Sequence, residues 1–165
     1  MFNILYDIEI WFRMTFGLGP KRKLANIYWK DISQEWVIRP IIDVPDRAYI
    51  EASSEENRLG SDESEETVIG TIRKTIESCR YSKDYCDAAS LKGWKKFVDE
   101  HYLIMGELRN SSLCFEPWIR KQKGHKNGHY VPHPTSEKLC APINDIDKAY
   151  LALCNAKKIA IDNEK

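Results

Sequence analysis

The chain has 165 residues, which is the usual size of one domain and enough to bury a core without a metal or a disulfide. Hydrophobic residues make up 42% and charged residues 30%, a globular composition that excludes disorder of the whole chain. Lysine plus arginine equals aspartate plus glutamate, 25 against 25, and zero net charge argues against a dedicated nucleic-acid-binding protein. We expect a single domain over residues 1–165.

The N-terminal 18 residues are apolar but fit two structures. Apolar side chains at every second position from Phe2 to Ile10 favour a strand, whereas Ile4, Ile8 and Trp11 also fit one face of a helix, so helix remains open. The charged residues of this segment break the apolar run expected of a secretory signal or a membrane span; they are Asp7, Glu9 and Arg13. We therefore expect a cytoplasmic protein.

The next part of the chain predicts a β-hairpin followed by a loop. Residues 27–32 and 36–42 are rich in β-branched and aromatic side chains, and residues 33–35 suit the turn between them. Pro40 cannot donate a ladder hydrogen bond, so we expect the second strand to be an edge strand or bulged. The polar residues 51–63 predict a surface loop.

Periodic apolar residues predict three helices. The first, over about 65–79, buries Val68, Ile69, Ile72, Ile76 and Cys79, and Asp62 with Glu65 resembles a capping box. The second runs from about 90 to 105, buries Leu91, Trp94, Phe97, Val98 and Tyr102, and ends at Gly106. The third begins near Asn144, with Ile146, Ala149, Tyr150, Leu153 and Cys154 on its core face.

Four prolines and two glycines between residues 107 and 143 exclude a long helix there and leave short strands at 113–119 and 130–131. The expected fold is therefore α+β, with a mostly antiparallel sheet packed against two to three helices. The five cysteines form no C-x-x-C pair, and their odd number favours reduced, mostly buried thiols over a disulfide framework.

No motif for catalysis or cofactor binding is present. The chain has neither a G-x-S-x-G elbow nor a phosphate-binding G-x-x-x-x-G-K, so we predict no enzyme, no catalytic residues and no cofactor. His125, His129 and His133 are spaced by four, but nearby glycines and prolines exclude a helix, and in a strand adjacent rings lie about 13 Å apart. We predict no metal site, because one zinc cannot bridge that distance. The alternative is a small nuclease or hydrolase that uses these three histidines.

Charge is distributed unevenly along the chain. Residues 43–66 hold nine acidic residues and two arginines, whereas residues 109–138 hold six lysines and arginines and two glutamates. An acidic surface attracts a basic partner, although a solvated loop with helix-capping carboxylates accounts for about half of these charges. We predict a partner-binding face made of Asp43, Asp46, Tyr49, Glu51, Glu55, Glu56, Asp62, Glu63 and Glu66.

Three segments carry a resemblance to a known family: SDESEETVIGTIRKTIESCRYS at 61–82, GWKKFVDEHY at 93–102 and DIDKAYLALCNAK at 145–157. Over residues 35–157 the chain resembles the immunity proteins of bacterial contact-dependent growth inhibition (CDI) systems. The resemblance implies a cytoplasmic protein without catalysis, which binds and neutralises a cognate toxin domain, commonly a nuclease. The expected partner is thus a basic toxin domain, with no nucleic acid, no membrane and no small-molecule substrate.

Overall fold

The computed structural model describes residues 4–44, 48–51, 55–82, 92–120, 130–134 and 137–163. Within these ranges four helices and eight strands form an α+β fold, which confirms the predicted class. In chain order they are α1 (Ile4–Thr15), β1 (Lys23–Lys30), β2 (Glu35–Val44), β3 (Ala48–Glu51), β4 (Asn57–Gly60), α2 (Glu65–Glu77), α3 (Trp94–Glu100), β5 (Tyr102–Arg109), β6 (Ser112–Arg120), β7 (Tyr130–Pro132), β8 (Leu139–Pro142) and α4 (Ile146–Asp162).

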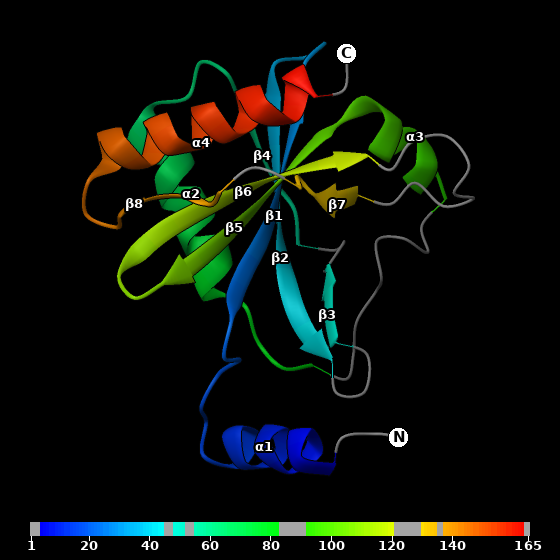
Figure 1. Cartoon of the computed structure of the whole chain (residues 1–165), viewed down its shortest axis with the longest axis vertical. Helices are drawn as coiled ribbons and strands as arrows, with labels where there is room; N and C mark the ends of the chain where they lie inside the picture. The colour runs from blue at the N-terminus through cyan, green and yellow to red at the C-terminus, as the bar shows by residue number, and fades with distance from the viewer. Residues whose placement is uncertain are drawn as a thin grey trace.

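The strands form one antiparallel sheet in the order β3-β2-β1-β5-β6-β7. Four longer strands make its centre, and each outer edge is covered by two short strands. β2 pairs with both β3 and β4, and β6 pairs with both β7 and β8. In Figure 1 the strands fan out strongly, as the right-handed twist of β-sheets requires.

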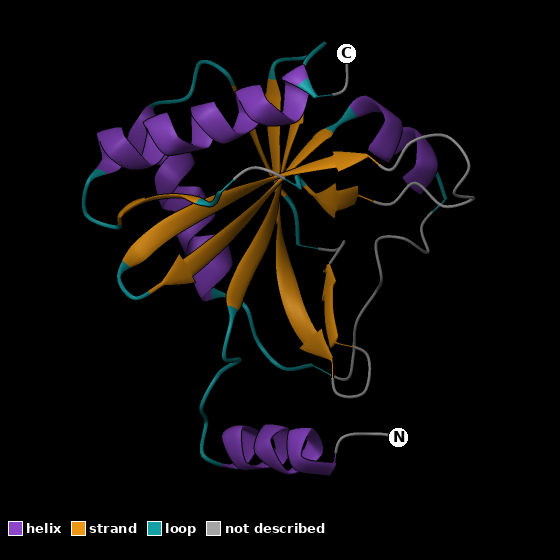
Figure 2. Cartoon of the chain, viewed as in Figure 1, coloured by secondary structure: helices purple, strands orange, loops and turns teal. Residues whose placement is uncertain are grey.

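Helices α2 and α4 cover one face of this sheet (Figure 2). Alternate residues of the central strands point towards them, because side chains of a strand alternate between its two faces. Ile27, Ile38 and Ile104 meet there with Ile72 of α2 and Leu153 of α4, all with no exposed surface. Each such side chain contributes about 1.5–3 kcal/mol when it leaves water, so this layer is the main core.

The opposite face of the sheet carries a smaller apolar cluster under α3. Tyr28, Val37 and Leu103 are neighbours of the core isoleucines along their strands and therefore point away from α2 and α4. Trp94 and Phe97 of α3 pack against them. This second face holds the polar residues of the candidate site.

The N-terminal segment corrects one expectation. It is the helix α1, so the strand prediction is wrong and the helical alternative is right. In Figure 1 α1 stands apart from the sheet, and none of the described strands pairs with it. A helix forms all its backbone hydrogen bonds internally, and this favours it for a segment without a neighbouring strand.

The hairpin of β1 and β2 is confirmed, and Pro40 shows why β2 tolerates a proline. On the β1 side Pro40 faces Ala25. On the other side, β4 pairs with residues up to Ile38 and β3 pairs from Ile41, so neither of these two strands uses the missing donor of Pro40. The expectation that the second strand lies at the edge of the sheet is therefore wrong, because β2 has neighbours on both sides. Among the described strands, however, Pro40 itself has a partner only on the β1 side. The surface loop predicted over residues 51–63 is also partly wrong, because residues 57–60 of that range form β4.

The second predicted helix is much shorter than expected. α3 ends at Glu100, and the apolar residues after His101 form β5. Gly106 is not a helix stop. It lies in β5, where an added Cβ would come within 2.9 Å of the Ile27 Cδ1 and 3.2 Å of the Ile76 Cδ1, so glycine allows α2 to approach the sheet closely.

The other two predicted helices are confirmed with different caps. The five residues predicted to line the core face of the first are all buried. Its N-cap is Ser64, whose hydroxyl accepts from the Thr67 amide, rather than Asp62. The N-cap of α4 is Asp145, which accepts from the Lys148 amide, rather than Asn144. Ala149 and Leu153 are fully buried in the core, as predicted.

A disulfide corrects the expectation of reduced thiols. Cys114 of β6 and Cys140 of β8 lie directly opposite in the antiparallel ladder, with their Cα atoms 4.0 Å apart, and their sulfurs are bonded. The pair is 26 residues apart in sequence, so only the register of the two strands brings it together. Cys79 and Cys154 are free thiols, as expected, and Cys86 lies outside the described residues.

Candidate partner-binding surface

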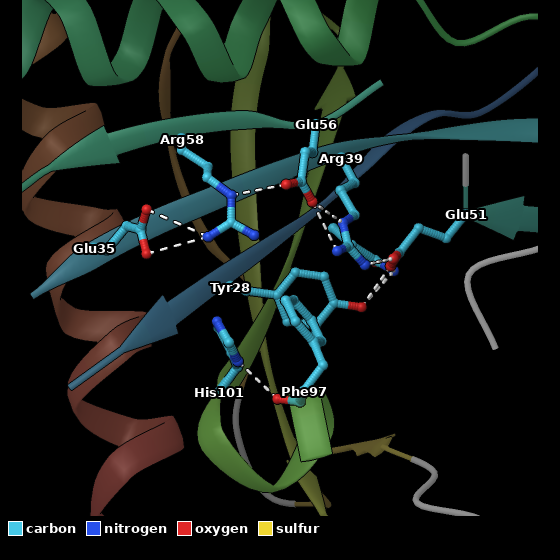
Figure 3. A network of polar contacts seen from close by, with 9 residues as sticks. Tyr28, Glu35, Arg39, Glu51, Glu56, Arg58, Phe97 and His101 are labelled. Atoms are coloured by element: carbon cyan, nitrogen blue, oxygen red, sulfur yellow. Dashed lines mark hydrogen bonds and ion pairs between the residues drawn. The ribbon is translucent and has the colours of Figure 1, made fainter. Parts of the chain in front are cut away.

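Arg39 lies at the centre of a buried ionic network on the second face of the sheet (Figure 3). Its Nη1 donates to Glu51 at 2.8 Å, and its Nε and Nη2 donate to Glu56 at 3.0 and 2.8 Å. The guanidinium also lies 4.2 Å from the ring centre of Phe97, a cation–π contact. Burial works to lower the pKa of Arg39, but the two carboxylates outweigh burial and raise it.

Glu51 accepts further hydrogen bonds from two residues of β1. The Asn26 amide and the Tyr28 hydroxyl both donate to its Oε2. Burial, followed by the nearby Glu51 carboxylate, raises the pKa of Tyr28 well above its ordinary value, so the phenol stays protonated and donates. Glu51 is therefore a buried, fully engaged carboxylate that holds β3 against β1 and β2, and a partner cannot reach it readily.

Two more arginines engage the acidic residues that follow. Arg58 donates to Glu56 at 2.7 Å, and Arg80 donates to Glu55. Burial works to raise the pKa of Glu56, but Arg58 and Arg39 together lower it. Hydrogen bonding to Arg80 lowers the pKa of Glu55 despite slight burial. Both carboxylates remain ionised, but much of their charge is neutralised within the chain.

A second group of acidic residues stays open to solvent at the start of α2. Its members are exposed and form no ion pair with the described part of the chain; they are Asp62, Glu63, Glu65 and Glu66. Ser64 in their midst caps the helix. The positive end of the helix dipole favours carboxylates here, which explains part of the sequence pattern. We call these four residues the α2 acidic cluster.

The remaining predicted interface residues lie elsewhere. Asp43 is buried in β2, where its backbone exchanges hydrogen bonds with Arg80 and Ser82. Tyr49 lies in β3 opposite Asp43. Asp46 lies outside the described residues. The acidic segment predicted as one face is thus split between a buried network and the exposed α2 acidic cluster.

A hollow of about 360 Å³ lies between β2, β4 and the C-terminal half of α2. Pro40, Asn57 and Thr75 form part of its wall, and Glu55 and Lys74 contribute charged side chains. The Asn57 amide donates to the Thr75 hydroxyl at 3.2 Å, which joins β4 to α2. The hollow is close to Glu55 and is large enough for one or two side chains of a partner.

His101 is buried beneath the same network. Its Nδ1 lies 2.6 Å from the Phe97 carbonyl oxygen, so this nitrogen carries the proton and donates. Burial lowers the pKa of His101, and the positive charges of Lys30 and Arg39 add to this effect. The ring stacks on Phe97 with centroids 3.9 Å apart. A neutral, stacked histidine with its Nε2 shielded from solvent fits a packing role.

The histidines proposed for the alternative activity are only partly described. His133 follows β7, and its amide donates to the Pro117 carbonyl at 3.1 Å. His125 and His129 lie outside the described residues. In the part of the chain that the structure describes, no three histidine, cysteine or acidic side chains are gathered in a way that could hold a metal ion. None of the described helices has the length and apolar character needed to cross a membrane.

Sequence reasoning missed the residues that organise the network. Arg39 is the one charged residue between Trp36 and Ile42 of β2, and a lone charge in such an apolar run is a usable sign of a buried ion pair. No signal in the sequence links it to Glu51, Glu56 and Phe97, because these come from three other parts of the chain. Their meeting depends on strand register.

Comparisons with known proteins support the fold and leave the family open. No protein-family model matches the chain, and no curated protein matches it either. Two solved structures share its architecture. A protein of unknown function, NMB0488 from Neisseria meningitidis, is 11% identical, with a TM-score of 0.59 over 82% of this chain and 93% of that one.

The second structure is a chain of the CdiA-CT/CdiI toxin and immunity complex from Yersinia pseudotuberculosis. It is 8% identical, with a TM-score of 0.55 over 82% of this chain and 98% of that one. At such identities the likeness establishes a shared fold. This chain therefore has an α+β fold like that of a component of a toxin–immunity complex.

Proposed function

We propose that this chain is an immunity protein of a contact-dependent growth inhibition system, which binds and neutralises a cognate toxin domain in the cytoplasm. The observation that carries the proposal is the fold shared with a chain of the CdiA-CT/CdiI complex, of which 98% is matched. The chain acts by binding and not by catalysis. Its toxin is a nuclease whose active site is basic.

The α2 acidic cluster supports the proposal. A nuclease that binds the phosphates of nucleic acid presents positive charge at its active site. Asp62, Glu63, Glu65 and Glu66 offer carboxylates whose charge is not neutralised by described neighbours, in contrast to Glu51, Glu55 and Glu56. Four carboxylates on one exposed turn can occupy such a basic surface and exclude its substrate.

The Arg39 network supports the same surface indirectly. Arg39 binds Glu51 at the end of β3 and Glu56 just before β4, and so joins these two parts of the chain to β2. β4 in turn leads directly into the α2 acidic cluster. A surface held in place before binding loses less conformational freedom on association, which raises affinity. Tyr49 and Asp46 remain predicted members of this surface.

The function is tested by finding the partner and assaying protection. The tagged chain is used to capture proteins from the source cell, and each captured protein is expressed alone and together with this chain. We expect one captured protein to carry a domain that degrades nucleic acid and stops growth, and co-expression of this chain to restore growth. A partner that is harmless to the cell, or growth that is not restored, would contradict the proposal.

The surface is tested with a matched pair of variants. Asp62, Glu63, Glu65 and Glu66 are all replaced by lysine, and in the control four exposed carboxylates elsewhere are replaced by lysine, namely Asp99, Glu137, Asp147 and Asp162. Asp147, like the cluster, is an exposed carboxylate in the first turn of a helix, so it controls for the lost dipole interaction. We expect the toxin dissociation constant to rise at least about 100-fold in the first variant and to change little in the second. Equal affinities would exclude the α2 acidic cluster from the interface.

A further inference from the structure

Helix α1 and the turn after it present an unusual amount of apolar surface. Their exposed apolar residues, which we call the apolar stripe, are Ile8, Trp11, Phe12, Met14, Phe16 and Leu18. Trp11 is 66% exposed and Phe16 is 63% exposed. The rings of Phe12 and Phe16 contact each other, with centroids 4.5 Å apart, instead of entering the core. Large exposed apolar patches of this kind mark interaction sites in proteins.

The orientation of α1 is fixed by contacts on its other side. Arg13 donates twice to the Gly19 carbonyl, at 3.0 and 2.9 Å, and the Lys21 ammonium lies 2.6 Å from Glu9. Ile10 is buried, with 5% of its surface exposed. Glu9 and Arg13 are one turn apart and share the helix face that these contacts hold. The apolar stripe therefore faces outward because the polar side of the helix is tied to its own chain.

The charges around the apolar stripe indicate what kind of partner it fits. The stripe itself contains no charged residue. Of the three cations that follow α1, two are paired within the chain: Lys21 with Glu9, and Arg22 with Glu107 at 2.9 Å. Little positive charge remains to attract anionic lipid, and the stripe has no negative charge to attract a basic toxin. A surface with a single charged residue at its edge, Asp7 one turn before Trp11, can face a copy of itself with little repulsion between like charges.

The area of the apolar stripe also fits a pair of identical chains. Large aromatic side chains offer about 150–250 Å² each, so the exposed fractions correspond to roughly 600 Å² per copy. Two stripes that covered each other completely would bury about 1,200 Å² in total, which is the lower end of the range for specific protein interfaces. Tryptophan, phenylalanine and methionine are among the residues enriched in such interfaces.

We propose that the apolar stripe is the contact surface of a homodimer, in which the α1 helices of two copies pack against each other. Trp11 and Phe12 are the central anchors, because they are the large side chains on the outer face of the helix itself. The α2 acidic cluster is part of another element and takes no part in this contact. The dimer is independent of the proposed immunity function, so either proposal can fail without the other.

The mass of the full chain in solution tests the dimer directly. Sedimentation equilibrium at increasing concentration should show a species of twice the chain mass of 19.2 kDa. Replacing both Trp11 and Phe12 by glutamate places like charges on both sides of the contact, and should weaken dimerisation at least about 100-fold. The control replaces Ile32 and Leu151, which are 90% and 60% exposed elsewhere on the molecule, by glutamate and should leave the dimer intact.

Complementary charges provide a sharper arm of the same experiment. A variant with Trp11→Lys and Phe12→Lys should be monomeric alone and should form a mixed dimer with the glutamate variant. If the glutamate variant does not fold, as judged by circular dichroism, Phe16→Glu with Leu18→Glu gives the same test outside the helix. A wild-type chain that stays at 19.2 kDa at every concentration overturns the proposal. A folded variant of the apolar stripe that still dimerises also overturns the proposal. A monomeric wild-type chain that binds phosphatidylglycerol vesicles through Trp11 overturns it as well.

Discussion

At the scale of single residues, the second face of the sheet depends on how one buried cation is satisfied. Arg39 is 6% exposed and would be costly to bury alone. Two glutamates and the ring of Phe97 surround it, and Glu51 is bound in turn by Asn26 and Tyr28. Removing one member leaves its partners buried without compensation, so the effects of substitution should differ greatly between this network and the exposed ion pairs.

Replacing Arg39 by methionine should destabilise the chain by about 3–5 kcal/mol, because Glu51 is left buried without its cation. The same change at Arg58, whose side chain is 49% exposed, should cost about 1 kcal/mol or less. Unfolding in urea measures both. Adding Glu51→Gln to the Arg39 variant should recover part of the loss. Equal losses in the two single variants would show that Arg39 is not specially buried in solution.

The lowered pKa of His101 predicts how the stability of the chain depends on pH. Its pKa in the folded chain is lower than the ordinary value of 6.5, so the unfolded chain binds a proton more readily than the folded chain does. The contribution of neutral His101 to the free energy of unfolding is fully present above pH 6.5. It is lost as the pH falls from 6.5 towards the lower pKa of His101 in the folded chain.

Urea unfolding at a series of pH values should therefore show stability decreasing as the pH falls below 6.5. The slope should be flatter in His101→Gln, which cannot titrate. The other three histidines of the chain are present in both proteins, so the difference between the two slopes belongs to His101. An unchanged slope in the variant would mean that His101 titrates normally.

At the scale of elements, β8 is a short strand held in place by more than its ladder. It pairs only with β6 among the described strands, over four residue pairs that include the Cys114–Cys140 disulfide. α4 begins four residues after β8 and packs against β6 and β8. The disulfide therefore stabilises the position of the C-terminal helix as well as the edge of the sheet.

Reduction of the disulfide should lower the free energy of unfolding by about 3 kcal/mol, because the unfolded chain regains the freedom of the closed loop. Chemical unfolding with and without a reducing agent measures the difference, and Cys114→Ser with Cys140→Ser should abolish it. Thiol labelling of the chain in denaturant should find two fewer reactive cysteines before reduction than after. Equal labelling would show that the two cysteines are reduced, as the sequence alone suggests.

The same scale shows where local patterns mislead. Residues 91–102 carry helical spacing, and α3 does form at Trp94, but Tyr102 already belongs to β5. Strands β1 and β6 lie on both sides of β5 and complete its backbone hydrogen bonds. The spacing of apolar residues within a short segment cannot predict that β5 forms here, because both strands that pair with it are distant in sequence.

At the scale of the whole molecule, the two surfaces discussed belong to separate elements and differ in character. The α2 acidic cluster is charged and lies at the start of a helix packed on the sheet, whereas the apolar stripe is neutral and lies on α1 outside the sheet (Figure 1). Binding through the first should depend strongly on ionic strength, and association through the second should depend on it weakly.

Salt therefore distinguishes the two surfaces. The association rate with the toxin should fall about tenfold or more from low to physiological ionic strength, and the variant with lysines at the α2 acidic cluster should lose this dependence. Stopped-flow mixing of the chain with its captured partner measures the rate. The mass of the homodimer should stay constant across the same salt range. A toxin association rate that is insensitive to salt would contradict an acidic interface.

The sequence by itself determined the α+β class, the core faces of α2 and α4, and the first hairpin. These follow from spacing within a few residues, because a helix face and a strand face repeat over short distances. The acidic residues of segment 43–66 are also read directly from the sequence. Only the tertiary structure decided which of those carboxylates are buried with Arg39 and which stay exposed at the start of α2.

The tertiary structure alone also decided the pairing of Cys114 with Cys140, the role of Gly106 and the helical form of the N-terminal segment. The first two depend on neighbours that strand register and sheet order supply, and in the third none of the described strands pairs with α1. Such contacts join residues far apart in the chain, and their energy depends on the whole sheet having formed. A local pattern fixes which side chains can be buried, and the register of the sheet fixes which of them meet.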